Sequence, residues 1–326
     1  MHAVILREHG GPDVLELREI PSPEPGPGQI RVRVVYTALN RADLLQRAGF
    51  YPAPPGSPRD ILGLEYAGYV DALGPGVLRW KEGDPVMGLV GGGSYAEALV
   101  VHEREAVAIP AGLSLRDAAA IPEAFVTAYD ALVVRGRLGP GDTALIHAAA
   151  SGVGTAAVQI AAALGARVIG TTRTEGKRRS LEHLGPHTWM VLSASRFADE
   201  VRQATGGRGV DVVLELVGGA YVPESLASCA HRGRLVLVGL TGGASASLDL
   251  SLVLRQRLEI HGTVLRSRPL EEKIEAASLL ERRILPLLTL GRLAPVIDRE
   301  FPLHQASEAH RYLATNTSVG KVLLKI

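Results

Sequence analysis

Alternation of apolar and polar residues marks the first 122 residues of the chain. Val14–Ile20 and Ile30–Tyr36 place apolar side chains at every second position, which is the period of a half-buried strand. The segment PSPEPGPG between them is too rich in Pro and Gly to form a helix. Many short strands in succession predict an antiparallel barrel or sandwich. We also expect a helix at Thr37–Ala48 and strands at Glu65–Leu73, Asp84–Leu89 and Ala96–Val101.

From residue 123 short apolar runs alternate with segments of helical period. The runs have strand length and are rich in β-branched residues, and each helical segment is long enough to cross over a sheet. Six strands joined by crossover helices predict an α/β domain with a doubly wound parallel sheet, the Rossmann arrangement, over 123–267. The strands are expected at Ala144–His147, Ala166–Thr172, Trp189–Leu192, Val210–Val217, Arg234–Gly239 and Leu258–Val264.

The tail of the chain continues after this sheet is complete. Leu270–Ile284 has the period of a helix, and Val319–Ile326 alternates like a strand. Because the six-stranded sheet needs no further strand, we expect the tail to join the first domain. The predicted domains are therefore 1–122 with 268–326, and 123–267.

The stretch Thr143–Thr174 carries the first candidate chemistry. An apolar strand leads into the turn Ala148–Gly154, and a helix and a second strand follow. In this order the helix N-terminus can bind the pyrophosphate of a dinucleotide, and Gly152 and Gly154 allow the backbone to approach the phosphate around Val153. The alternative is an ordinary glycine-rich turn.

The end of the second strand of that domain bears on the choice of nucleotide. NAD-binding sheets place an acidic residue there to bind the ribose 2′-hydroxyl. Here the strand ends Thr171-Thr172-Arg173-Thr174, and the next carboxylate is Glu175. Thr172, Arg173, Thr174 and Lys177 are therefore predicted to bind the 2′-phosphate of NADPH, and NADH is the less favoured cofactor. The alternative is that Arg173 and Lys177 are solvated charges at a helix start.

Composition narrows the class of protein. The formal net charge is +1 and aromatic residues make up 4%, which does not favour nucleic-acid binding. Gly, Arg or Glu interrupts every stretch of about 18 apolar residues, so no membrane span is predicted. Cys229 is the only cysteine, which excludes an internal disulfide and is typical of a reducing cytoplasm.

Several longer motifs stand out along the chain, namely GGPDVLE (10–16), ALNRADLLQR (38–47), ILGLEYAG (61–68), AAAIPEAFVTAYDAL (118–132), HAAASGVGTAAVQ (147–159), LRSR (265–268) and GK (320–321). With these motifs the chain resembles, over essentially its whole length, the zinc-free quinone oxidoreductase branch of the medium-chain dehydrogenase/reductase superfamily. The likeness is greatest to its tumour-suppressor-inducible NADPH quinone oxidoreductase type. The resemblance implies a GroES-like β-barrel domain beside the Rossmann domain.

Zinc is not expected. Zinc-dependent relatives carry Gly-His-Glu where this chain reads Gly63-Leu64-Glu65, and no cysteine precedes Cys229. Alcohol oxidation would then lack its usual Lewis acid. A quinone or an activated double bond is already electron-poor and needs only orientation and a donor at the developing oxyanion. We therefore expect an NADPH-dependent quinone reductase, with an enoyl or alkenal reductase as the alternative. A non-catalytic structural or RNA-binding role is an alternative of another class.

The resemblance places Asn40, Asp43 and Tyr51 on the substrate side. Tyr51 is the preferred hydrogen-bond donor, and Ser151 in the nucleotide turn is the second choice. For Tyr51 the alternative is packing on neighbouring prolines, and for Ser151 it is a bond to the turn backbone. For Asn40 and Asp43 the alternative is that they cap and orient the local helix.

The resemblance also implies cofactor contacts beyond the turn, and two departures from the family. Relatives often close the third strand with Asn-Tyr, where this chain has Val191-Leu192-Ser193, and Leu216 stands where a small polar residue is common. The edge strand that begins at Leu258 is expected to pair two subunits in a homodimer. The implied cofactor contacts are Thr127, Gly239, Leu240, Val264, Leu265, Arg266, Asn316 and Lys321.

Overall fold

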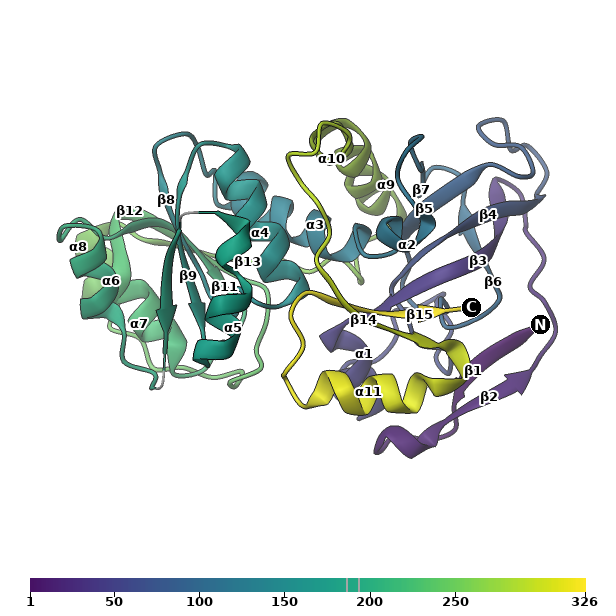
Figure 1. Cartoon of the computed structure of the whole chain (residues 1–326), viewed down its shortest axis with the longest axis horizontal. Helices are drawn as coiled ribbons and strands as arrows, with labels where there is room; N and C mark the ends of the chain where they lie inside the picture. The colour runs from purple at the N-terminus through teal and green to yellow at the C-terminus, as the bar shows by residue number, and fades with distance from the viewer. Residues whose placement is uncertain (186, 193) are drawn as a thin grey trace. The chain divides into compact units, whose positions relative to one another are not determined.

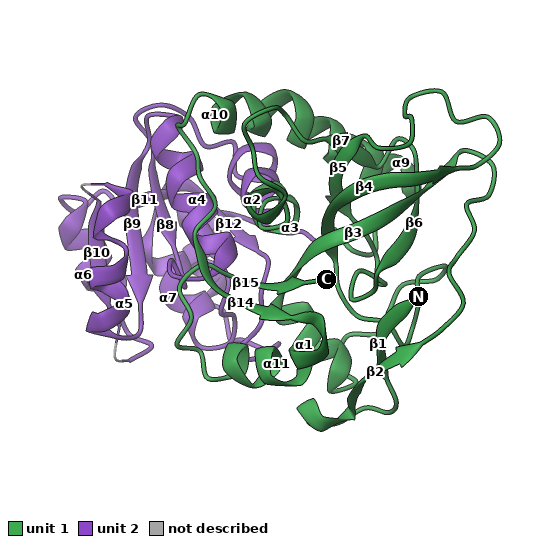
Figure 2. Ribbon diagram, turned by 45° about the vertical axis from the view of Figure 1, so that its right-hand side comes forward, with its two compact units in different colours: residues 1–126, 265–326 green, residues 127–264 purple. Residues whose placement is uncertain are grey.

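The computed structural model describes residues 1–185, 187–192 and 194–326. They divide into two compact units, coloured separately in Figure 2. Unit 1 comprises Met1–Val126 and Leu265–Ile326, and unit 2 comprises Thr127–Val264. The assignment of these parts to substrate and to cofactor stays a prediction.

Unit 2 is built on a six-stranded parallel sheet, which confirms the predicted doubly wound fold (Figure 1). The strand order β10-β9-β8-β11-β12-β13 places the first strand in the middle, so the chain reverses direction across the sheet next to β8. The strands are β8 (Thr143–Ile146), β9 (Arg167–Thr172), β10 (Thr188–Val191), β11 (Val210–Glu215), β12 (Cys229–Leu237) and β13 (Glu259–Gly262).

Helices connect these strands, and the interior of unit 2 is apolar. Leu145, Val213 and Leu235 are fully buried on three neighbouring strands, because both faces of a parallel sheet are covered. Helix α3 (Pro122–Tyr129) begins in unit 1 and ends in unit 2. The other helical segments of unit 2 are η2 (Asp130–Arg135), α4 (Gly152–Ala163), α5 (Glu175–Ser180), η3 (Glu182–Leu184), α6 (Ala198–Ala204), α7 (Tyr221–Ser228) and α8 (Leu250–Gln256).

Unit 1 contains the GroES-like fold. Its main sheet has the order β14-β15-β3-β4-β5-β7, with β6 paired to β3, and β1 and β2 form a separate antiparallel pair. The last strand pairs antiparallel with β3, so both ends of the chain contribute to one unit. The strands are β1 (His2–Leu6), β2 (Leu15–Glu19), β3 (Gln29–Leu39), β4 (Glu65–Leu73), β5 (Pro85–Leu89), β6 (Ala98–His102), β7 (Ala106–Ala108), β14 (Ile297–Pro302) and β15 (Lys321–Lys325).

The helices of unit 1 are short. They comprise η1 (Pro12–Val14), α1 (Arg41–Arg47), α2 (Leu115–Ala118), α9 (Leu270–Leu279), η4 (Leu280–Ile284), α10 (Leu285–Thr289), η5 (Leu303–Gln305) and α11 (Ala306–Ala314). No helix among the described residues is long and apolar enough to cross a membrane.

The predicted helix at Thr37–Ala48 is wrong at its start. Strand β3 continues to Leu39, and the helix begins only at Arg41. Pairing with β15 extends the strand, because Leu39 lies opposite Val322, which is 283 residues later in the chain. A partner so distant in sequence leaves no local signal.

Two other expectations also need correction. The strand expected at Val14–Ile20 is β2, which runs only from Leu15 to Glu19 because Val14 belongs to the short 3-10 helix Pro12–Val14. Strand β12 begins at Cys229 rather than at Arg234. Of the departure noted at Val191-Leu192-Ser193, Ser193 lies outside the described residues.

Candidate functional site

The turn between β8 and α4 forms the candidate cofactor cradle. Ser151 caps the twelve-residue helix, and its Oγ accepts a hydrogen bond from the Gly154 amide at 3.0 Å. A Cβ at Gly154 would lie 2.4 Å from the carbonyl oxygen of Ala148, so only glycine fits. None of the described acceptors binds the amides of Gly152 and Val153, and a helix N-terminus of this kind binds phosphate. The cradle therefore fits a dinucleotide.

Ser151 stabilises the turn, and its catalytic role stays a prediction. Its oxygen accepts the Gly154 amide, which is the turn-stabilising alternative. Its hydroxyl proton has no acceptor among the described residues, so it can still donate a hydrogen bond. The structure leaves the proposed role open on chemical grounds.

The end of β9 is basic. Arg173 is exposed, and Thr174 caps α5 by accepting the Lys177 amide at 3.4 Å. Glu175, the nearest carboxylate in the sequence, is bound by Arg178 at 2.7 Å and by Arg179 at 3.4 Å. Its charge is therefore balanced along its own helix, which leaves Arg173 for an anion.

A buried hydrogen-bonded chain joins the strands beneath this cradle. The Ser225 hydroxyl donates to Glu215 Oε2 at 2.7 Å, so its oxygen must accept from His147 Nε2, 2.9 Å away. His147 Nδ1 then accepts from the Thr171 hydroxyl at 3.0 Å. Burial lowers the pKa of His147, which favours the neutral ring that this direction of bonding requires.

The acidic end of that chain shapes the turn after β11. Glu215 Oε1 accepts the amides of Val217 at 2.8 Å and Gly218 at 3.0 Å. Gly239, a predicted cofactor contact, lies where a Cβ would be 2.6 Å from the carbonyl oxygen of Leu216. Leu240 beside it is exposed. The ends of β8, β9 and β11, where a doubly wound sheet binds its ligand, are thus held by one network.

In unit 1, Lys321, Asn40 and Glu65 form a buried charged cluster. Lys321 Nζ donates to Glu65 Oε1 at 2.6 Å, to Asn40 Oδ1 at 2.7 Å and to the carbonyl oxygen of Leu39 at 3.0 Å. The Asn40 amide also donates to Glu65 Oε1, at 2.9 Å. Because an ammonium has three protons, the predicted cofactor contact Lys321 has used all of them within this unit.

Asp43 has the contacts of a helix cap. It is fully buried, and its carboxylate accepts the amides of Asn40 at 2.7 Å and Gly63 at 3.1 Å. The Tyr95 hydroxyl donates to it at 3.3 Å. Burial raises the pKa of Asp43 to about 6, against the lowering effect of those amides. The capping alternative describes these contacts.

His310 extends this chain away from Asp43. Arg47 Nη1 donates to His310 Nδ1 at 3.3 Å, so the other ring nitrogen carries the proton and donates to the Tyr95 oxygen at 3.2 Å. Burial and the nearby Arg47 charge lower the pKa of His310 to about 3. The ring is neutral at physiological pH.

Tyr51 is held by Arg266. The guanidinium carbon of Arg266 lies 5.2 Å from the centre of the Tyr51 ring, and Nη1 donates to the Tyr51 carbonyl oxygen at 3.3 Å. Arg266 also donates to the carbonyl oxygen of Gly91 at 2.7 Å and to Gln46 Oε1 at 2.5 Å. Arg266, predicted as a cofactor contact, is buried and binds the loop that carries Tyr51.

Glu123 is a candidate that the sequence interpretation missed. It is the second residue of α3, and its amide donates to Glu65 Oε2 at 2.8 Å. Loss of hydration and the nearby Glu65 carboxylate together raise its pKa to about 8, against the lowering effect of Lys321. Its only signal was its place in the motif IPEAFVTA, which by itself indicates a helix start.

The remaining predicted contacts are distributed over both units. Thr127, at the start of unit 2, is buried, and Val264 at its end is exposed. Leu265 is buried. Asn316 follows α11 in a left-handed conformation and accepts from Arg41 Nη2 at 2.5 Å.

The residues do not fit a zinc site. Leu64, where zinc-dependent relatives carry histidine, is a buried apolar residue that offers no ligand atom. Cys229 begins β12 in unit 2, and burial raises the pKa of its thiol to about 12. Across the described residues, no group of three or more His, Cys, Asp or Glu side chains could hold a metal ion.

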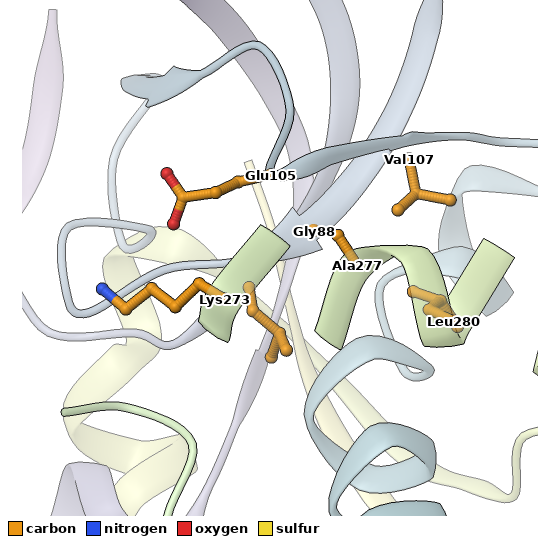
Figure 3. Close-up of a pocket in the computed structure, with 7 residues that line it drawn as sticks. Gly88, Glu105, Val107, Lys273, Ala277 and Leu280 are labelled. Atoms are coloured by element: carbon orange, nitrogen blue, oxygen red, sulfur yellow. The ribbon is translucent and has the colours of Figure 1, made fainter. Parts of the chain in front are cut away.

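A pocket in unit 1 lies apart from these residues. Figure 3 shows it between the β5 and β7 strands and α9, with Glu105 and Lys273 at one end. Its lining is Gly88, Leu89, Glu105, Val107, Lys273, Ala277 and Leu280, and none of these is a predicted site residue.

The chain matches two known domain families. Residues 26–111 match the alcohol dehydrogenase GroES-like domain, and residues 152–282 match the zinc-binding dehydrogenase family. The word zinc-binding belongs to the name of the family and does not establish a zinc site in this chain. Leu64 stands where a histidine ligand would be, and Cys229 is the only cysteine.

Characterised proteins resemble the chain over its whole length. A quinone oxidoreductase of Pseudomonas aeruginosa is 35% identical over 97% of both chains, and a 2-haloacrylate reductase of Burkholderia is 31% identical over 99% of this chain and 98% of its own. The crystal structure of Escherichia coli quinone oxidoreductase complexed with NADPH superposes with a TM-score of 0.90 at 30% identity, covering 100% of both chains.

Proposed function

Since this chain belongs to the quinone oxidoreductase branch of the medium-chain dehydrogenase/reductase superfamily, we propose that it is an NADPH-dependent, zinc-independent reductase of quinones. The observation that carries the proposal is the end of β9, where Arg173 is exposed and the carboxylate of Glu175 is bound by Arg178. This arrangement suits a ribose 2′-phosphate and would not bind a free 2′-hydroxyl as an acid does.

The cofactor would be held by groups of unit 2. The amides of Gly152 and Val153 would bind the pyrophosphate, and Arg173 with Thr174 would bind the 2′-phosphate. The buried chain through His147 would keep the ends of β8, β9 and β11 in place. Bound NADPH supplies a hydride. The NADPH complex of the Escherichia coli relative supports this choice.

The substrate would be oriented by groups of unit 1. A quinone needs a hydrogen-bond donor at the oxygen that becomes negative, and the Tyr51 hydroxyl is such a donor. Arg266 fixes the loop and ring of Tyr51, so the donor would be preorganised. Asn40, tied to Lys321 and Glu65, would be a positioning residue rather than a free donor.

A second candidate function is the reduction of an activated double bond. It is favoured by the likeness to a 2-haloacrylate reductase, whose name describes reduction of an alkene conjugated to a carboxyl group. The same donor would then stabilise an enolate oxygen. The same residues suit both reactions, so turnover of defined substrates is needed to distinguish the two functions.

Turnover of two substrate panels tests the proposal. NADPH oxidation is measured with simple benzo- and naphthoquinones and with alkenals and acrylates. We expect the higher kcat/KM with quinones, and Tyr51→Phe should lower it by about 10²-fold because one oxyanion donor is removed. Tyr69→Phe, a change on the separate strand β4, is the matched control. Turnover of alkenes alone would establish the alternative, and turnover of neither would reject both reductase functions.

We further propose a homodimer through the β13 edge. Strand β13 pairs only with β12 among the described strands, and its Ile260 is 39% exposed. Leu250 and Leu254 on the preceding helix α8 are 73% and 78% exposed. Two copies pairing along this edge would cover these groups. Light scattering of the wild type should give twice the mass of the chain, and the Ile260→Lys variant should give the mass of a single chain. A monomeric wild type would reject this assembly.

A reducing compartment, the cytoplasm, is also part of the proposal. Cys229 is a free cysteine, and burial raises the pKa of its thiol. A single buried thiol without a disulfide is typical of a protein in a reducing compartment. Localisation of a tagged full-length chain tests this directly.

A further inference from the structure

Glu123 is a carboxyl group that the fold places without a cation of its own. Its backbone amide donates to Glu65 Oε2 at 2.8 Å, which holds the start of α3 against the start of β4. Its side chain is half-buried, and its carboxyl has no hydrogen-bond partner in the described part of the chain. It is therefore partly shielded from water and still accessible.

The two nearby cations, Lys321 and Arg266, donate their hydrogen bonds to other groups. The protons of the Lys321 ammonium go to Glu65, Asn40 and a backbone carbonyl. The Arg266 guanidinium binds Gln46 and two backbone carbonyls. Both cations act on Glu123 only through space, and Glu65 and Asp43 oppose them.

The balance of these charges keeps Glu123 neutral. Loss of hydration is the largest influence, followed by the like charge of Glu65, and together they raise the pKa of Glu123 to about 8. The carboxyl is then mostly protonated at neutral pH. Two carboxyl groups thus lie close together in different states: Glu65 is bound by the ammonium of Lys321, and Glu123 carries a proton. Neighbouring carboxyl groups in different protonation states are typical of acid–base sites.

Glu123 also acts on Tyr51. Burial raises the pKa of the Tyr51 phenol, the Glu123 carboxyl raises it further, and Arg266 lowers it. These three groups share one electrostatic environment within unit 1. Tyr51, a phenol whose pKa lies above 10, can donate a hydrogen bond but releases its proton less readily than a carboxyl with a pKa of about 8.

We propose that Glu123 is the proton donor of the reduction, an inference that rests on the proposed function. Hydride transfer brings two electrons and one hydrogen to the quinone and leaves one oxygen negative. The O–H bond of Glu123 then breaks and an O–H bond forms on that oxygen, which yields the neutral hydroquinone. Glu123 is left as a carboxylate and regains a proton from water before the next turnover.

The pH profile of the holoenzyme tests this role. Wild-type kcat for a quinone should fall above a pH of about 8, as Glu123 loses its proton. Glu123→Gln keeps the size and polarity of the side chain but has no proton to give. We expect its kcat to be lower by about 10²-fold and the alkaline limb to vanish, with NADPH affinity unchanged within about twofold. Glu123→Asp should keep the limb and recover part of kcat.

A matched control lies in the same unit. Glu105 is also half-buried with a raised pKa, but it lines the separate pocket of Figure 3. Glu105→Gln should leave kcat and the pH profile as they are. An alkaline limb of wild-type size in Glu123→Gln would overturn the inference.

An infrared titration supplies a test that does not use turnover. The spectrum of the wild-type protein at neutral pH should contain a protonated carboxyl band that Glu123→Gln lacks, and no such difference would also overturn the inference. Wild-type protein that reduces no quinone would reject the proposed function instead, whereas normal wild-type turnover with an unaltered Glu123→Gln profile would reject Glu123 alone.

Discussion

The ammonium of Lys321 lies 2.6 Å from the carboxylate of Glu65, and both side chains are buried. Strand β15 supplies the cation and β4 supplies the anion, with β3 between them in the sheet. The last strand is thus tied to the first domain by charge as well as by backbone pairing.

Removal of the Lys321 charge should destabilise the protein strongly. Lys321→Met leaves Glu65 as a buried charge without a counterion, which costs about 3–5 kcal/mol. Urea unfolding followed by circular dichroism measures the change in the free energy of unfolding. Lys325→Met, on the exposed end of the same strand, is the control and should have an effect within about 0.5 kcal/mol. A small loss at Lys321 would show that Glu65 is readily protonated or hydrated.

His310 should make stability depend on acid. Its native pKa of about 3 lies below the ordinary 6.5, so the unfolded chain binds a proton that the native state refuses. The contribution of His310 to the free energy of unfolding is complete above a pH of about 6.5. It is lost by about 1.4 kcal/mol per pH unit as the pH falls toward 3. Asp43 has the opposite sign, because its native pKa of about 6 exceeds the ordinary 3.8 and protonation below 6 favours the native state.

The variant His310→Gln isolates the histidine from Asp43. Below a pH of about 6.5 its free energy of unfolding should fall less steeply than that of the wild type, as measured by urea unfolding at several pH values. His304→Gln, at an exposed position, should follow the wild-type curve. Parallel curves for His310→Gln and wild type would contradict a depressed native pKa.

Arg173 should discriminate between the two nicotinamide cofactors. Arg173→Ala removes a charge-assisted hydrogen bond to the 2′-phosphate, so the Kd for NADPH should rise by roughly 10- to 100-fold while that for NADH changes little. Fluorescence titration gives both constants. Arg167→Ala, at the exposed start of the same strand, is the control. Equal losses for both cofactors would assign Arg173 to general electrostatics.

Arg266 should affect the substrate and not the cofactor. Arg266→Lys keeps the charge but loses the planar stack on Tyr51 and the forked hydrogen bonds. We expect kcat/KM for the quinone to fall by about tenfold with an unchanged Kd for NADPH. The exposed Arg283→Lys is the control. A raised Kd for NADPH would instead support the cofactor contact that the family resemblance implies for this residue.

Local patterns in the chain were enough to predict its fold and the cofactor cradle. The alternation over Ile30–Tyr36 lies within β3, where Ile30, Val32 and Val34 are buried, because a strand with one buried face must repeat every two positions. The small residues from Ser151 to Gly154 identify their own turn, since capping and close backbone approach involve neighbours in sequence. For the same reason, the β9 end with Arg173 could be recognised without its surroundings.

Only the tertiary structure decided what the polar residues of unit 1 contact. Lys321 reaches Glu65 across 256 positions and Arg266 reaches Gln46 across 220. Glu123 seemed to be no more than a helix start until Glu65 was found beside its amide. Protonation depends on burial and on the charges that folding brings close, and neither quantity is a property of a local segment. The local sequence therefore predicts where a cofactor can bind. Which side chain holds a proton depends on contacts between residues that are distant in the sequence.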